Sequence, residues 1–215
     1  MEQNVSMDKQ ITTIYTRCSE PLRIRSTSDG TPGRTIEGCA IVFGQEGLVM
    51  RCPDEEIREV IMPGAITREL LDRCDIKMTL NHDPQQLLGR SQEGRGTLSY
   101  DVRDDGVYFA FEAPHTVDGD KALELVRRGD ISGCSFAFIP ARGGYKVSRT
   151  QEGDRTVYHC EVTAVREVCD FSLVVTPAYP QTSVSLRRYA EAAGPDVAMQ
   201  TAIEAQAAEM ERAAE

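Results

Sequence analysis

The sequence predicts an α+β protein that consists mostly of antiparallel β-strands. Two pairs of alternating apolar and polar segments are each joined by a short turn sequence, at residues 104–106 and 151–154, and short loops of this kind join antiparallel neighbours. Before the C-terminal tail, only two segments have the apolar spacing of a helix. A closed or nearly closed barrel would leave such strands without exposed edges.

Apolar runs bounded by turn residues place the strands along the chain. The segment from Glu37 to Phe43 is apolar enough for a buried strand, and the strand that begins at Asp75 runs directly into the turn sequence Asn81-His82-Asp83-Pro84. The expected strands are residues 22–25, 35–43, 75–80, 97–102, 107–112, 133–139, 145–149, 155–165 and 171–175.

Two helices and one loop complete the central region. Pro63 suits the first turn of a helix, and the apolar residues up to Leu71 give residues 63–73 a helical stripe. The second helix spans residues 118–128 and ends at Gly129. The polar residues 44–59 are expected to form a loop.

The chain divides into three parts. Residues 1–20 are polar and weakly patterned, which indicates a flexible arm or a short edge strand. Residues 21–189 form the domain. Residues 190–215 form an acidic tail with ten alanines, six acidic residues and one arginine, and it is expected to be helical. This tail is either a solvated segment or a scaffold-like helix that binds a partner.

The composition argues against several classes of function. The 215 residues include 24 basic and 34 acidic side chains, so the net charge is −10. Such a charge is unfavourable for binding nucleic acid or an anionic membrane surface. No apolar run approaches the roughly 20 residues that span a bilayer, and the first ten residues carry no apolar signal-peptide segment. We therefore expect a cytoplasmic protein without nucleic-acid or membrane partners.

The cysteines indicate neither a metal site nor a disulfide framework. The seven cysteines are spaced irregularly and form no Cys-x-x-Cys pair. In a reducing cytosol they are expected to be reduced and mostly buried. No phosphate-binding glycine motif is present either, so no metal and no cofactor is expected.

Three polar residues are candidates for chemistry. His82 lies where a strand meets a turn, which suits a general base near the surface. Ser135 interrupts a strand that is otherwise apolar on both faces, and a nucleophile paired with a histidine would explain it. Asp170 begins an apolar strand and is a candidate for the acid that orients the imidazole. Ser132 is the competing nucleophile, and His159 competes with Asp170.

Several segments resemble those of the tailed-bacteriophage prohead proteases. Asn81-His82-Asp83-Pro84 with Leu88-Gly89-Arg90 resembles the histidine segment of that family, and residues 125–138, which include Ser132-Gly133-Cys134-Ser135, resemble its serine segment. The other matching segments, in the order of the family, are residues 37–43, 61–65 and 174–180. The resemblance runs from about Leu22 to Ser185.

This resemblance implies a serine endopeptidase whose fold is similar to that of the herpesvirus maturation protease, a mostly antiparallel, β-barrel-like core ringed by a few helices. It assigns Ser135 as the nucleophile, His82 as the base and Asp170 as the third member. The family more often has Met where Cys134 stands and Glu where Asp170 stands. Because herpesvirus proteases use a second histidine as third member, His159 stays an alternative.

The resemblance also implies a place and partners. The protease would act in the host cytoplasm, inside the viral prohead, on the scaffold protein or the scaffold segment of the major capsid protein, and on itself. A homo-oligomer is expected, since confinement in a capsid favours association. The alternative function is an inactive assembly or scaffolding protein with the same fold. A general cytosolic serine hydrolase lacks support, because the chain has no Gly-x-Ser-x-Gly motif.

Overall fold

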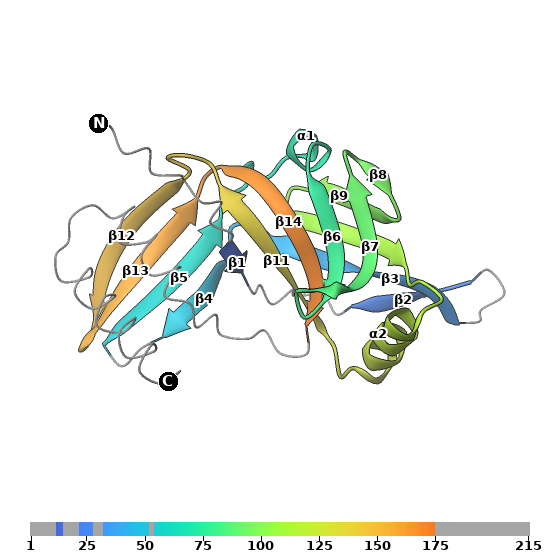
Figure 1. The fold of residues 1–215 in the computed structure, drawn as a ribbon. Helices are drawn as coiled ribbons and strands as arrows, with labels where there is room; N and C mark the ends of the chain where they lie inside the picture. Colours follow the sequence, from blue (N-terminus) through green and yellow to red (C-terminus); the bar gives the residue numbers. More distant parts are fainter. Residues whose placement is uncertain (1–11, 15–21, 28–31, 52–53, 175–215) are drawn as a thin grey trace, which may run out of the picture.

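The computed structural model describes residues 12–14, 22–27, 32–51 and 54–174. Their strands form three sheets, one of six strands and two of four strands, and two helices accompany them (Figure 1). Two of the strand pairs are parallel, β5 with β13 and β6 with β14, whereas the other pairs are antiparallel. The predicted class, α+β with mostly antiparallel strands, is confirmed.

The six-stranded sheet carries the residues singled out by the sequence. Its strand order is β1-β11-β14-β6-β7-β8. The strands are β1 (Thr12–Ile14), β11 (Gly133–Pro140), β14 (Val165–Val174), β6 (Asp75–Leu80), β7 (Asp83–Gln92) and β8 (Arg95–Gly96). β14 begins several residues earlier than predicted. It occupies the interior of the sheet, antiparallel to β11 and parallel to β6.

A four-stranded sheet packs behind this one, as Figure 1 shows. Its order is β2-β3-β10-β9, with β2 (Arg23–Ser26), β3 (Pro32–Val42), β10 (Gly106–Glu112) and β9 (Leu98–Arg103). The alternating phenylalanines of β10 face the first sheet, and the rings of Phe109 and Phe171 are 6.4 Å apart. The apolar core between the two sheets therefore fixes one face of β14 and leaves the other for polar groups.

The third sheet corrects one prediction. Its order is β12-β13-β5-β4, with β12 (Tyr145–Glu152), β13 (Arg155–Val162), β5 (Glu55–Ile61) and β4 (Glu46–Arg51). The expected loop at residues 44–59 is thus wrong, because it contains two strands. Glu56 is buried, and Arg58 and Arg155 pair with its carboxylate. Pairing with arginines allows these charged residues to lie inside a sheet.

The first predicted helix is shorter than the sequence suggested. Residues 62–65 form a β-turn in which the Ala65 N–H donates to the Met62 carbonyl at 3.0 Å, with Pro63 and Gly64 in its central positions. Gly64 has φ +86°, which fits the third position of a type II turn. Helix α1 (Arg68–Leu71) begins only after Thr67, whose hydroxyl caps it.

The second helix agrees with its prediction. Helix α2 (Val117–Arg128) is capped by Thr116 and ends at Gly129, which has φ +78°. A left-handed residue of this kind ends many helices, and glycine adopts it without steric cost. The helix lies against β2 and β7.

The predicted barrel does not close among the described strands. Each of the three sheets is open, and short or polar strands such as β8 and β12 form some of their edges. The tail at residues 190–215 lies outside the described residues, as does the arm at residues 1–20 apart from β1.

Candidate active site

His82 occupies a tight turn between β6 and β7. Leu80 pairs with Asp83, so Asn81 and His82 form a two-residue hairpin loop. Both have positive φ, 52° for Asn81 and 58° for His82, as a type I′ turn requires. Residues with a side chain seldom adopt this backbone region, although Asn and His do so more often than most. The turn therefore fixes the direction in which the imidazole leaves the sheet.

Two hydrogen bonds anchor this turn to the neighbouring strand β14. The Asn81 N–H donates to the Leu173 carbonyl at 2.9 Å, and the His82 N–H donates to the Ser172 hydroxyl at 2.7 Å. The Ser172 hydroxyl in turn donates to the Thr79 carbonyl at 3.3 Å. Ser172 has no exposed surface. The backbone of His82 is thus held over the face of β14 that carries Ser172.

The imidazole of His82 contacts Asp170 on that same face. Nδ1 lies 2.9 Å from Oδ1 and 3.1 Å from Oδ2 of the carboxylate. Both side chains are largely buried, with 17% and 15% of their surface exposed. Asp170 pairs with Ala137, while Val168 pairs with Phe138, so Cys169 is an extra residue in the ladder. Bulges of this kind re-aim side chains beside active sites.

Ser135 lies on the next strand, β11. It pairs with Ser172, and Ala137 pairs with Asp170, without a break in register between the two pairs. Residues that pair directly across antiparallel strands share a face of the sheet, so Ser135, Ser172 and Asp170 lie on one face. Ser135 has no exposed surface, which distinguishes it from Ser132, an exposed residue that precedes the strand.

These positions bring a carboxylate, an imidazole and a hydroxyl to one face of the sheet. A hydrogen bond from Nδ1–H to Asp170 leaves Nε2 of His82 as the basic nitrogen, and that atom is shielded from solvent. An imidazole in this tautomer can accept the proton of a nearby serine hydroxyl. The structure brings His82 and Asp170 into direct contact and puts Ser135 one strand away on the same face.

The rival residue His159 lies in a different sheet. It is part of β13, where Nδ1 lies 2.6 Å from Oε1 of Glu46 and Nε2 lies 2.9 Å from the Thr150 hydroxyl. Both ring nitrogens thus have partners within the sheet formed by β12, β13, β5 and β4. His115 is exposed and lies in the connection before α2. Of the three histidines, His82 is the one that shares a sheet face with Ser135.

The cysteines beside the site are held as neutral thiols. Burial raises the pKa of Cys134, the neighbour of Ser135, far above its ordinary value. Burial also raises the pKa of Cys169, the neighbour of Asp170, to about 11. A thiol must ionise before it becomes a good nucleophile, so neither cysteine competes with a serine at neutral pH. All five described cysteines are free, as predicted.

Sequence reasoning did not single out Ser172. Its position in an apolar strand, two residues after Asp170, is the signal that could have identified it, since a buried hydroxyl requires a partner. That partner is the backbone of His82, 90 residues earlier in the chain. The contact joins two distant segments, and no local pattern reveals it.

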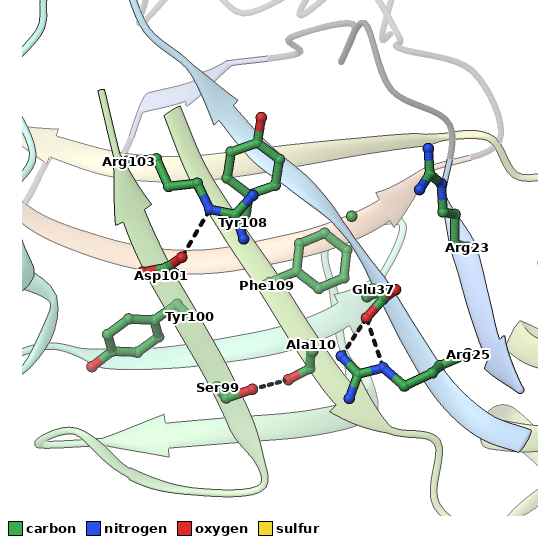
Figure 2. Close-up of a pocket in the computed structure, with 11 residues that line it drawn as sticks. Arg23, Arg25, Glu37, Ser99, Tyr100, Asp101, Arg103, Tyr108, Phe109 and Ala110 are labelled. Atoms are coloured by element: carbon green, nitrogen blue, oxygen red, sulfur yellow. Dashed lines mark hydrogen bonds and ion pairs between the residues drawn. The ribbon is translucent and has the colours of Figure 1, made fainter. Parts of the chain in front are cut away.

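A hollow of about 320 Å³ lies on the sheet of β2, β3, β10 and β9, away from the residues described above (Figure 2). Residues of β2, β3, β9 and β10 line it, and none comes from the strands that carry His82, Ser135 or Asp170. Figure 2 shows Arg25 directed at Glu37 and Arg103 directed at Asp101. Because these charges compensate each other within the hollow, we assign it no function.

Two negative findings apply to the described ranges. Among residues 12–14, 22–27, 32–51 and 54–174, no three His, Cys, Asp or Glu side chains are grouped so that they could hold a metal ion. Within the same part of the chain, neither helix is long and apolar enough to cross a membrane.

Comparison with known proteins bears on the identity of the chain. The family model of the caudovirus prohead serine proteases matches residues 20–194. Among solved structures, the capsid assembly protease of bacteriophage T4 aligns over 76% of this chain and 97% of its own, with 16% identity and a TM-score of 0.41. None of the curated proteins compared with the chain matches it.

Proposed function

Because the chain belongs to the caudovirus prohead serine protease family, we propose that it is a serine endopeptidase with Ser135 as nucleophile, His82 as general base and Asp170 as the orienting acid. The observation that carries this assignment is the 2.9 Å contact between His82 Nδ1 and Asp170 Oδ1, on the sheet face that Ser135 shares. The same pairing supports Asp170 over His159 as the third member.

The proposed reaction is acyl transfer to Ser135. Nε2 of His82 takes the proton from the Ser135 hydroxyl while Oγ attacks the scissile carbonyl carbon. The imidazolium then gives this proton to the leaving amine as the peptide bond breaks. Water, activated by the same nitrogen, hydrolyses the acyl-enzyme and restores the serine. Asp170 stays ionised throughout, orients the ring and stabilises its charged form.

The proposed substrates follow from the family. We propose cleavage of the scaffold protein, or of the scaffold segment of the major capsid protein, inside the prohead assembled in the host cytoplasm. Self-cleavage would occur near residues 190–195, where small residues link the domain to the acidic tail. Confinement within the prohead would raise the local concentration and favour a homo-oligomer.

The burial of Ser135 favours one alternative function. A nucleophile with no exposed surface is what an inactive assembly protein of this fold would carry. Such a protein would retain the site as a buried polar cluster and would use its acidic tail in assembly.

Co-expression with the major capsid protein of the same genome tests the proposal against this alternative. The unsubstituted chain should produce truncated capsid protein or a truncated protease, detected by intact mass. Ser135→Ala should abolish both products, and Ser132→Ala, the matched control, should leave them unchanged. Processing that persists in Ser135→Ala and stops in Ser132→Ala would transfer the nucleophile to Ser132. Capsid assembly without any processing would favour the assembly protein.

A further inference from the structure

The strand that carries Ser135 has the outermost strand of the sheet as one of its neighbours. On one side, β11 pairs with β14 along its full length, from Gly133 to Pro140. On the other side its partner among the described residues is β1, in the register Thr12 with Phe138, Thr13 with Ala137 and Ile14 with Phe136. Without β1, β11 would be the outer strand of the sheet, with a row of backbone N–H and C=O groups open to another chain.

This edge lies on the side of Ser135 away from His82 and Asp170. The sheet order places His82, which follows β6, and Asp170 on β14 to one side of Ser135, and β1 to the other side. Since adjacent strands lie about 4.8 Å apart, a peptide added along the β11 edge would bring its carbonyl groups beside the serine and opposite the base. A strand that continues the register of β1 past Phe136 reaches Ser135 at its next position.

The binding mode also suits an endopeptidase. A peptide that adds as a strand is recognised through main-chain hydrogen bonds, and its alternate side chains can supply specificity. β1 is the outermost strand of its sheet and pairs with β11 alone among the described strands, so it opens more easily than an interior strand. Ser135 has no exposed surface, so a peptide reaches its hydroxyl only after a covering segment moves.

We propose that the edge of β11 at Phe136–Phe138 is the peptide-binding edge of this protein, and that β1 occupies it until an extended substrate segment replaces it. The partner is therefore a peptide in β conformation, and residues 12–14 are a displaceable substitute for it within the chain. The inference rests on the proposed peptidase function, because it gives the binding mode of that same site.

A binding experiment in the Ser135→Ala chain tests the edge without any cleavage. The probe is a fluorescent synthetic peptide with the sequence of residues 9–17, which contains the β1 strand. The double substitution Thr12→Pro with Thr13→Pro should weaken β1. The N–H groups of neighbouring residues point to opposite sides of a strand, so one of the two prolines removes a hydrogen-bond donor to β11. Thr12→Ala with Thr13→Ala is the matched control.

The proline variant should bind the peptide about tenfold more tightly than the alanine control, since it no longer carries a competing strand. A version of the peptide with the two prolines should not bind. Equal affinities for the two variants, or no binding to either, would overturn the inference. A thermal melt of each variant shows that the fold is retained.

Hydrogen exchange in the chain with an intact β1 gives a second measurement. At saturating peptide, the amides of residues 12–14 should exchange faster while those of Phe136–Phe138 stay protected. Unchanged exchange at residues 12–14 with peptide bound would contradict displacement. Cleavage is measured separately, in the unsubstituted chain. If the peptide binds as expected but no processing occurs, the proposed peptidase function is wrong and the binding edge stands. If processing occurs but the two variants bind the peptide equally, the binding edge is wrong and the peptidase function stands.

Discussion

The described part of the chain contains two histidine–carboxylate pairs, and their surroundings differ. His82 pairs with Asp170 at 2.9 Å in the six-stranded sheet, and His159 pairs with Glu46 at 2.6 Å in the sheet of β12, β13, β5 and β4. His159 also has a hydroxyl at its second nitrogen, that of Thr150 at 2.9 Å. By distances alone, the second cluster has the same order of groups as a catalytic triad.

The two histidine–carboxylate pairs differ in backbone conformation and in solvent exposure. His82 lies in a left-handed turn whose N–H is held by Ser172, and its pair is largely buried. His159 lies within a regular strand, and its partner Glu46 is 40% exposed. A surface pair of this kind is screened by water and contributes little. Fixed orientation and a low-dielectric setting, more than a short distance, therefore favour the pair of His82 and Asp170 for the proposed activation of Ser135.

The largest expected effect comes from neutralising Asp170, and the equivalent change in the other pair is its control. Asp170→Asn should lower kcat for peptide cleavage by about 10³–10⁴-fold, because the amide favours the wrong tautomer of His82. Glu46→Gln, the equivalent change in the other pair, should alter kcat by less than about twofold. Steady-state kinetics on a peptide that contains a mapped cleavage site measures both. A larger loss in Glu46→Gln would make His159 the catalytic histidine.

The next effect concerns the hydroxyl that anchors His82. Ser172→Ala leaves the His82 N–H buried without its acceptor, so the ring should lose its fixed position and kcat should fall about tenfold, with little change in KM. Ser91, a fully buried serine of β7 in the same sheet, provides the matched control. Ser91→Ala should leave kcat unchanged. Equal losses in the two variants would mean that Ser172 acts only through packing.

Changes in the Asn81-His82 turn should have a smaller effect, which we expect in the free energy of unfolding. Asn81→Val places a β-branched residue at φ 52° and should lower the free energy of unfolding by about 1–2 kcal/mol. Asn81→Gly, which accepts this backbone, should change it by less than about 0.5 kcal/mol. Thr150→Val on the strand beside His159 exchanges one β-branched residue for another and should also be tolerated. Denaturant titrations measure all three, and a harmless Asn81→Val would show that the turn relaxes.

The smallest effect is a pH dependence in the hairpin that carries His82. The Arg90 guanidinium, with help from Lys77, lowers the pKa of Asp75 to about 2. A carboxyl group whose pKa is depressed stabilises the fold at pH values above its unfolded pKa, about 3.9, and this contribution is lost as the pH falls through about 2. Because Asp75 is about one-third exposed, we expect only about 0.5 kcal/mol.

Denaturant titrations of Asp75→Asn at pH 7 and at pH 2 check this sign. The variant should be slightly less stable than the unsubstituted chain at pH 7, and the difference should shrink at pH 2. A difference that grows towards low pH would contradict the assignment.

Local patterns predicted the parts of the site that depend on local chemistry. The turn around His82, the strand of Ser135 and the end of α2 at Gly129 each follow from residues adjacent in sequence. The sequence made Asp170 a candidate for the orienting acid beside His159 and the family resemblance favoured it, whereas its contact with His82 became visible only in the fold.

The errors arose where distant contacts override local pattern. The polar residues 44–59 suggested a loop, yet Glu56 among them is buried and pairs with Arg155 of β13. Pro63 suggested the start of a helix, although Gly64 after it completes a type II turn. The role of Ser172 depends on a backbone N–H far away in the sequence. Such partners are set by tertiary packing, which no window of residues contains.

The parallel pairing of β14 with β6 also determines when the site can exist during synthesis. His82 and Asp170 are 88 residues apart, and β14 is the last strand of the described chain. Pairings with such a large separation in sequence form late, since a long loop must close first. A nascent chain that ends before β14 carries the histidine and the serine but no acid to orient them. The contact that orients His82 therefore forms only after β14 has been synthesised.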